Sequence, residues 1–155
     1  MIAGVTAGGR PVPASPPPAG LPHSYWRIRV TKTQAVNYSS FGEIEMAATI
    51  GGADQCVGGT PSDSAGAGAA TVFDNNTETA WWWYDPPQWV AYQFATPVAV
   101  ASVRITAENG NFAGVAASPK DFTVEYSDNG TSWVVAATVT GQTGWAAREV
   151  RTFNL

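Results

Sequence analysis

The sequence predicts an all-β protein, a β-sandwich or barrel of about eight short antiparallel strands. Three observations predict this class. Apolar and polar residues alternate with a period of two in several short segments, as in "YWRIRV" and "FTVEY". Sixteen glycines and eleven prolines supply turns between them. Only 13% of the residues are charged, which is unfavourable for surface helices, and no segment has a convincing amphipathic helical pattern.

The expected strands follow one another from residue 25 to the end of the chain. They span 25–30, 43–46, 90–94, 98–107, 122–126, 131–139 and 148–155, and the alternation changes phase within 98–107, which predicts a bulge near Ala101–Ser102. The Asn-Gly pair in "SDNG" predicts a hairpin after residue 126. A short helical turn is expected at Ala69–Phe73, and the glycine-rich residues 51–70 should cross the surface. The expected core residues are Trp26, Ile28, Val30, Ile44, Met46, Val90, Tyr92, Phe94, Phe122, Val124 and Tyr126.

The first 23 residues differ in composition from the rest. Five of the eleven prolines lie between positions 11 and 18, so this segment favours extended polyproline conformation. It is either a flexible tail or cloning remnant, or an arm that lies on a partner. We therefore divide the chain into a Pro/Gly-rich arm at residues 1–23 and a β-domain at residues 24–155.

Charge and composition argue against several classes of partner. The net charge is −4 and no basic stripe is present, which disfavours nucleic acid and anionic membrane surfaces. No stretch approaches the length of a membrane span, and the first residues lack the apolar core of a signal peptide. The single cysteine, Cys56, excludes an internal disulfide and fits synthesis in a reducing cytoplasm.

The sequence does not predict an enzyme. The only histidine, His23, follows the proline-rich segment, and Cys56 has no candidate histidine partner within the folded region. A glycosidase would need two carboxylates flanking a cleft. The carboxylates of Asp74, Glu78 and Asp85 are close in sequence, but Asp74 has another expected role, described below.

Three phrases of the sequence resemble one known family. They are "AATVFDNNTETAW", "QWVAYQFATPVAVASVRI" and, most specific of the three, "SPKDFTVEYSDNGTSWVVAAT". They are similar to motifs of the discoidin-like, coagulation-factor type C domains, a branch of the galactose-binding-like fold. The resemblance covers roughly residues 24–155 and implies an antiparallel β-sandwich with jelly-roll topology.

The order of the motifs departs from the family pattern. Strands that usually end such domains come first here, as "SYWRIRV" and "SFGEIEM", while the chain finishes with "VRTFNL". This looks like a circular permutation, which requires Leu155 to lie close to His23–Tyr25. The permuted form with a proline-rich segment is similar to modules of bacteriophage tail and virion proteins. That resemblance implies a location on a virion or extracellular surface, with residues 1–23 contacting other virion proteins.

The resemblance also implies a structural calcium ion. Family members hold it beneath the loop that corresponds to "FDNNTETAW", where oxygen ligands converge. The matching residues here are Asp74, Asn76, Thr79, the Thr71 carbonyl, the Gly42 carbonyl and the Glu43 carboxylate. Asn75 replaces the usual glycine, and asparagine tolerates a left-handed backbone. The alternative is an ordinary Asx turn in which Asp74 and Asn76 cap their own backbone.

Several aromatic residues remain after core positions are assigned. We expect Trp26, Trp81, Trp89 and Trp133 to pack in the core, whereas consecutive strand residues cannot all face inward. Exposed rings beside polar groups suit sugar recognition, and the resemblance favours loops at one end of the sandwich. Two alternatives are a cover for the core edge and a protein–protein contact. The candidate glycan-binding residues are Trp82, Trp83, Tyr84, Asn37, Tyr38, Asn109, Asn111 and Phe112.

Together these features predict a non-catalytic carbohydrate-binding module of a phage particle that contacts host-surface glycans. The competing interpretation is a structural virion protein whose arm and exposed rings serve assembly. Self-association into a homo-oligomer is left open by the sequence.

Overall fold

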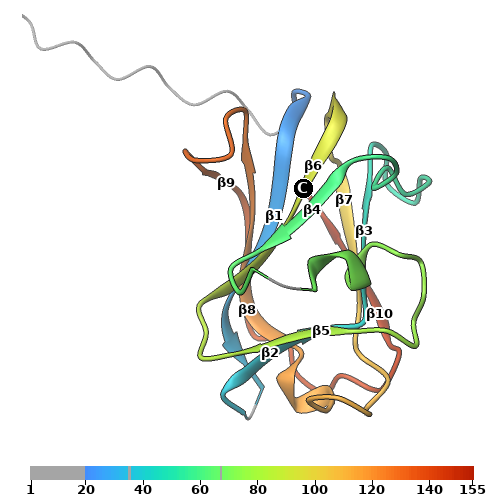
Figure 1. Ribbon diagram of the computed structural model, residues 1–155, viewed down its shortest axis with the longest axis vertical. Coiled ribbons are helices and arrows are strands. Elements are labelled where there is room, and N and C mark those ends of the chain that lie inside the picture. The colour runs from blue at the N-terminus through green and yellow to red at the C-terminus, as the bar shows by residue number, and fades with distance from the viewer. Residues whose placement is uncertain (1–19, 35, 67) are drawn as a thin grey trace, which may run out of the picture.

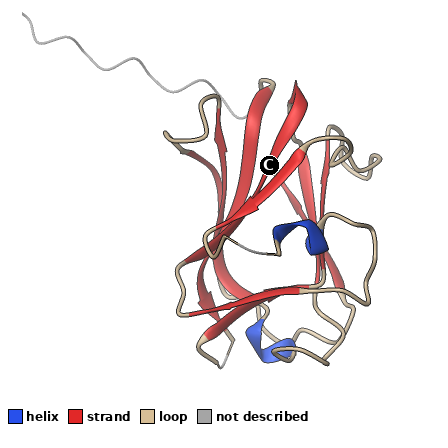
Figure 2. Ribbon diagram, in the orientation of Figure 1, coloured by secondary structure: helices blue, strands red, loops and turns tan. Residues whose placement is uncertain are grey.

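The structure, a computed structural model, describes residues 20–34, 36–66 and 68–155 (Figure 1). Within these residues the chain forms ten β-strands and two short 3-10 helical turns, with no α-helix (Figure 2). The predicted all-β class is therefore confirmed. The elements are β1 His23–Thr33, β2 Tyr38–Phe41, β3 Glu43–Ala47, β4 Thr60–Asp63, η1 Ala69–Val72, β5 Trp81–Tyr84, β6 Gln88–Val98, β7 Ser102–Thr106, η2 Val115–Ala117, β8 Pro119–Ser127, β9 Val134–Val139 and β10 Val150–Asn154.

The larger layer of the sandwich is a five-stranded antiparallel sheet with the order β4-β6-β1-β8-β9. Strand β1 lies at its centre and pairs along its length with β6 and β8. Its alternate residues Trp26, Ile28 and Val30 are fully buried, as their period of two predicts. All eleven core residues predicted from the alternation of apolar and polar residues are buried, and each such side chain contributes about 2 kcal/mol.

The second layer is a three-stranded antiparallel sheet with the order β10-β7-β3. Its buried residues belong to the same hydrophobic cluster as those of the five-stranded sheet. The ring of Phe122 on β8 meets the ring of Phe153 on β10 edge-on, with centroids 5.0 Å apart. The core therefore lies between the two sheets, as the predicted sandwich requires.

A separate two-stranded ribbon, β2–β5, crosses the lower end of the sandwich in the view of Figure 1. Two strands alone are marginally stable, so such a ribbon needs an anchor. Phe41 and Trp81 pair at one end of the ribbon, and both are buried with ring centroids 5.9 Å apart. The remaining residues of β5 extend past the core and are exposed.

The structure has more strands than the eight that we expected. Strands β2 and β4 were not predicted, because "YSSF" and "TPSD" are short and lack an apolar alternation. Strand β4 lies within residues 51–70, which were expected only to cross the surface, and it adds to the sheet beside β6. It is an edge strand containing Pro61, a position that tolerates the missing N–H of proline.

The bulge predicted within residues 98–107 is wrong. Strand β6 ends at Val98 in the five-stranded sheet, and β7 begins at Ser102 in the three-stranded sheet. The change of phase in the sequence therefore marks a corner at which the chain passes from one layer to the other. The corner is fixed by hydrogen bonds at Ala101, whose N–H donates to Ala47 and whose carbonyl accepts from Leu155.

The predicted hairpin after residue 126 joins β8 to β9. Gly130 adopts a left-handed backbone with φ of 71°, which the Asn-Gly pair favours. The side-chain oxygen of Asn129 accepts the N–H groups of Thr131 and Ser132 and closes the turn. The helical turn expected at Ala69–Phe73 is also present, as η1.

Two tryptophans expected in the core lie elsewhere. Trp133 and Trp89 are only half-buried, on the outer side of the five-stranded sheet. The guanidinium of Arg27 lies 4.1 Å from the ring centroid of Trp133 and 5.6 Å from that of Trp89. Arg27 also forms an ion pair with Glu125 at 2.5 Å. The rings therefore cover a charged pair on the sheet face rather than filling the core.

The described ends of the chain are neighbours. His23 pairs with Val98 at the start of β1, while the N–H of Leu155 donates to Ala101 three residues further on. Gly20 and Leu155 line one small pocket. His23, which we placed in the arm, is buried and belongs to β1, and residues 1–19 of the predicted arm lie outside the described residues. None of the helical turns in the described part could span a membrane.

Candidate functional site

A cluster of oxygen atoms lies in the loop between η1 and β5. The hydroxyl of Thr79 is 3.0–3.1 Å from both carboxylate oxygens of Asp74. The same hydroxyl is 3.1 Å from the carbonyl oxygen of Thr71 and 2.7 Å from that of Asn76. Four of the residues predicted as metal ligands are therefore brought together within one turn of chain.

Glu43, the first residue of β3, reaches this loop from a distant part of the sequence. Its carboxylate accepts the N–H of Asn76 at 3.1 Å, and the loop covers the side chain so that it is only 4% exposed. Burial, followed by the negative charge of Asp74, raises the pKa of Glu43 to about 7. Neither Glu43 nor Asp74 forms an ion pair with a basic side chain of the described residues. The two carboxylates thus share one site without a protein cation.

The neighbouring backbone explains the presence of Gly42, a residue of the predicted set, and of Asn75 in the loop. Gly42 donates its N–H to the carbonyl of Thr106, and a Cβ at Gly42 would lie 2.8 Å from the carbonyl oxygen of Ala107. Only glycine allows this close approach, which brings Glu43 up to the loop. Asn75 has φ of 57°, the left-handed conformation expected of the residue that replaces the family's glycine.

The Asx turns considered as an alternative are also present. The N–H of Asn76 donates to Asp74, and the N–H of Glu78 donates to the side-chain oxygen of Asn76. The main-chain carbonyl of Asn76 therefore faces the cluster, while its amide oxygen serves the turn. Among the described residues no group of three His, Cys, Asp or Glu side chains has the arrangement of a metal centre, so the cluster contains two carboxylates only.

A second feature is an aromatic pocket of about 190 Å³ at the exposed end of the ribbon. In the β2–β5 register Tyr38 lies opposite Tyr84 and Ser40 lies opposite Trp82. Since directly opposed residues share a face, these side chains point the same way. Phe112, from the loop after β7, completes the pocket. The pocket is lined by Tyr38, Trp82, Tyr84, Phe112 and Ala113, so four of the eight predicted glycan-binding residues meet here.

Trp83 does not belong to this pocket. It lies opposite Ser39, on the face of the ribbon that also carries the buried Trp81. The Trp83 side chain is 39% exposed, and its ring meets that of Tyr84 edge-on with centroids 6.1 Å apart. We expected that consecutive residues of this strand cannot all face inward, and both Trp82 and Trp83 reach the surface, on opposite faces of the ribbon.

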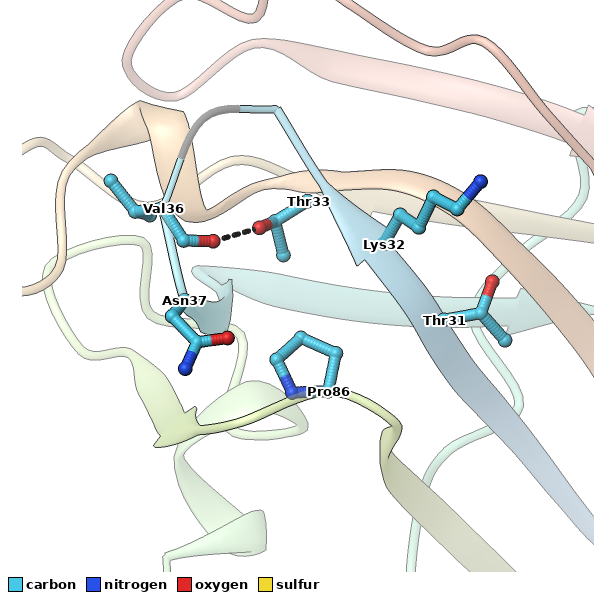
Figure 3. Close-up of a pocket in the computed structure, with 6 residues that line it drawn as sticks. All are labelled: Thr31, Lys32, Thr33, Val36, Asn37 and Pro86. Carbon is cyan, nitrogen blue, oxygen red and sulfur yellow. Dashed lines mark hydrogen bonds between the residues drawn. The ribbon is translucent and has the colours of Figure 1, made fainter.

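Asn37 lines a different, larger hollow of about 380 Å³ beside the ribbon. Its side chain donates to the carboxylate of Asp85, and Figure 3 shows Asn37 and Pro86 facing each other. Thr33 and Val36 also line this hollow, where the Thr33 hydroxyl donates to the Val36 carbonyl, whereas the Lys32 side chain points away (Figure 3). Asn37 therefore fixes the turn that follows Tyr84 and does not reach the rings.

Asn109 and Asn111 shape the loop that carries Phe112. The side-chain oxygen of Asn109 accepts the N–H of Asn111 at 2.9 Å, and its amide approaches Glu78 at 3.4 Å. Glu78 in turn forms an ion pair with Arg148 at 2.5 Å. Neither asparagine lines the aromatic pocket.

Glu108 was not predicted as a residue of the site. This side chain is fully buried behind the loop, and one carboxylate oxygen accepts the N–H of Phe112 at 3.0 Å. The other oxygen has no hydrogen-bond partner among the described residues. A glutamate at the start of the polar phrase "ENGNFAG" has the pattern of a solvated loop residue, so the sequence carried no signal of its burial.

The two residues considered as a catalytic base and nucleophile, His23 and Cys56, do not form a catalytic pair. His23 is 3.0 Å from a carboxylate oxygen of Asp128 and stacks on Tyr126, with ring centroids 3.9 Å apart. Cys56 is buried, and this burial raises the pKa of its thiol, which opposes thiolate formation.

Fold and site together define a class: a β-sandwich whose loops at one end carry an oxygen cluster and an exposed aromatic pocket, as in ligand-binding modules. The F5/8 type C domain family matches residues 57–155, and the chain belongs to this family. Members of it are modules that bind carbohydrates or other ligands and are generally non-catalytic. The match leaves β1–β3 outside it. Searches of curated proteins and of solved structures returned no match.

Proposed function

We propose that this protein is a non-catalytic carbohydrate-binding module whose ligand lies in the aromatic pocket. The observation that carries the proposal is the convergence of Tyr38, Trp82, Tyr84 and Phe112, which come from three separate segments, on one exposed pocket. Aromatic faces take the apolar C–H faces of sugar rings, and the phenolic hydroxyls can bond sugar hydroxyls. Family membership supports the same ligand class.

The biological setting that we propose is a phage tail or virion appendage that contacts host-surface glycans. The residues before β1 would contact other virion proteins, and the module would lie on the virion or extracellular surface. The positions of the N-terminal residues and of the ribbon at opposite ends of the sandwich suit this role. The described N-terminal residues lie at the upper end of the sandwich, and ribbon β2–β5, which carries three of the residues that line the pocket, lies at the lower end (Figure 1). An anchored arm would thus leave the pocket facing outward.

We further propose a structural Ca²⁺ ion at the oxygen cluster. The ion prefers six to eight oxygen ligands. The carboxylates of Asp74 and Glu43, the Thr79 hydroxyl and the carbonyls of Thr71 and Asn76 supply donors of the required kind. The buried carboxylate of Glu43 lies beside the exposed carboxylate of Asp74 without a basic partner, and a divalent cation would offset the cost of that arrangement. When bound, the ion would hold the loop against β3.

The proposal includes a circular permutation of the family's strand order. The neighbouring positions of Gly20 and Leu155 provide the closeness of ends that a permutation needs. The family match that starts at residue 57 supports it, because β1–β3 nevertheless complete the two sheets.

A glycan array probed with the full-length protein tests the proposed function. We expect binding to a restricted set of glycans, and we expect the same set to bind protein that lacks residues 1–19. A protein that binds no glycan at high concentration would contradict the proposal.

The second candidate is a structural virion protein, and Trp83 is the observation that favours it. This ring is 39% exposed outside the pocket, and exposed tryptophans are common at protein–protein contacts. Under this function, Trp83→Ala and removal of residues 1–19 should both reduce self-association measured by sedimentation. Under the carbohydrate function neither change should alter glycan binding.

A further inference from the structure

The rings of the aromatic pocket form the walls of a corner rather than a flat platform. The plane of Trp82 is inclined by 77° to that of Tyr38 and by 77° to that of Tyr84, with centroids 6.2 and 5.5 Å apart. The two tyrosine planes meet at 52° with centroids 4.9 Å apart. Phe112 adds a fourth ring from another loop. A group seated in this corner is within reach of several ring faces at once.

The side chains that line the pocket carry no formal charge. No lysine, arginine, aspartate or glutamate is among them, so no side chain of the lining would pair with an anionic group. Aromatic ring faces carry a partial negative charge and attract cations that lie within about 6 Å of the ring centroid. The pocket should therefore favour cationic groups over anionic ones.

The residues that line the pocket indicate which kind of cation it can bind. A primary ammonium has three N–H donors that need acceptors, and the lining side chains offer only two phenolic oxygens. A quaternary ammonium has no N–H donor, and its methyl groups contact ring faces directly. The cavity of about 190 Å³ suits one small head group, since ligand pockets for larger molecules span about 300–1,000 Å³.

We propose that this pocket binds a quaternary ammonium group, with Tyr38, Trp82, Tyr84 and Phe112 as an aromatic cage. The inference goes beyond the carbohydrate function and does not depend on it. The ammonium group can belong to a small molecule or to a substituent of a glycan.

The test is calorimetric titration of the full-length protein with choline and with its neutral isostere 3,3-dimethyl-1-butanol. The two probes differ in charge but hardly in shape. We expect choline to bind at least about tenfold more tightly, because cation–π attraction in a desolvated site is worth about 2 kcal/mol. Equal affinities, or no binding of choline, would overturn the inference.

Variants separate the roles of the residues. Trp82→Ala should reduce choline affinity at least about tenfold, while Trp83→Ala, on the opposite face of the same strand, should leave it unchanged. Tyr38→Ala removes a second ring of the cage and should weaken choline binding in the same way. Should neither Trp82→Ala nor Tyr38→Ala fold, the choline-to-isostere ratio of the unaltered protein decides alone.

A third probe identifies the source of the group. If N,N,N-trimethylglucosamine binds more tightly than choline, the natural ligand is a glycan that carries the ammonium group. If the two affinities are equal, the natural ligand is a small molecule. Both results support the cage. If neutral glycans bind the array but choline does not bind, the carbohydrate function stands and the cage is rejected. The reverse result retains the cage and rejects the carbohydrate function.

Discussion

Among single residues, the contact that matters most for the proposed ion site is that of Glu43 and Asp74 with the same loop. They are 31 positions apart in the sequence, yet both bond the N–H of Asn76. Since Ile44 and Met46 were assigned to the core, the alternation of apolar and polar residues puts Glu43 on the outer face of its strand. Only the resemblance to the discoidin-like domains predicted that Glu43 contacts the loop. Glu108 shows the opposite case, because nothing in its local sequence distinguishes a buried glutamate from a solvated one.

The calcium proposal predicts a specific stabilisation. Calcium at about one hundred times its Kd should stabilise the fold by about 2.7 kcal/mol, which corresponds to a rise in Tm of about 5–10 °C. Asp74→Asn should abolish the rise, because it removes the carboxylate whose two oxygens face Thr79. Differential scanning calorimetry with calcium and with chelator measures both.

Asp85→Asn is the matched control for this experiment. Asp85 is an exposed carboxylate outside the oxygen cluster, and asparagine tolerates its left-handed backbone. Its Tm should rise with calcium as that of the unaltered protein does. An identical Tm of the unaltered protein in calcium and in chelator would reject the ion site.

At the scale of elements, the pairing of β2 with β5 decides which rings meet. The phrase "WWWY" predicts that its rings alternate between faces, but not which face is which. The pairing of Tyr38 with Tyr84 decides which rings face the pocket, and these two residues are far apart in the sequence. Strand β2 itself escaped prediction because its three residues after Tyr38 lack an apolar alternation, so the pocket could be predicted only as a set of candidates.

The edge strand β4 gives an element-scale prediction. A Cβ at Gly59, just before this strand, would lie 2.2 Å from the carbonyl oxygen of Gln93 and 2.5 Å from the ring of Tyr92. Gly59→Ala should therefore force β4 away from β6 and lower the free energy of unfolding by about 1–3 kcal/mol. Urea denaturation measures the loss. Gly20→Ala, where a Cβ meets nothing within 4 Å, should have no effect, and equal behaviour of the two variants would count against this packing.

At the scale of the whole molecule, the sandwich was the most predictable feature. Its strands carry a period of two from Trp26 to Tyr126, and every residue assigned to the core on that basis is buried. The corner at 99–101 was misjudged, because a change of phase is the same in sequence whether a strand bulges or changes sheet. The closeness of Leu155 to the start of β1 was predicted from motif order alone.

The decisive comparison for a glycan site in the aromatic pocket is that of Trp82 with Trp83. The structure places Trp82 in the pocket and Trp83 on the opposite face of the ribbon. Isothermal titration calorimetry would measure the affinity of the best array glycan for the unaltered protein, Trp82→Ala and Trp83→Ala. We expect at least about a tenfold loss of affinity for Trp82→Ala, since aromatic contacts are worth about 1–3 kcal/mol, and no loss for Trp83→Ala. Equal losses, or a loss confined to Trp83→Ala, would mean that the glycan does not bind in this pocket.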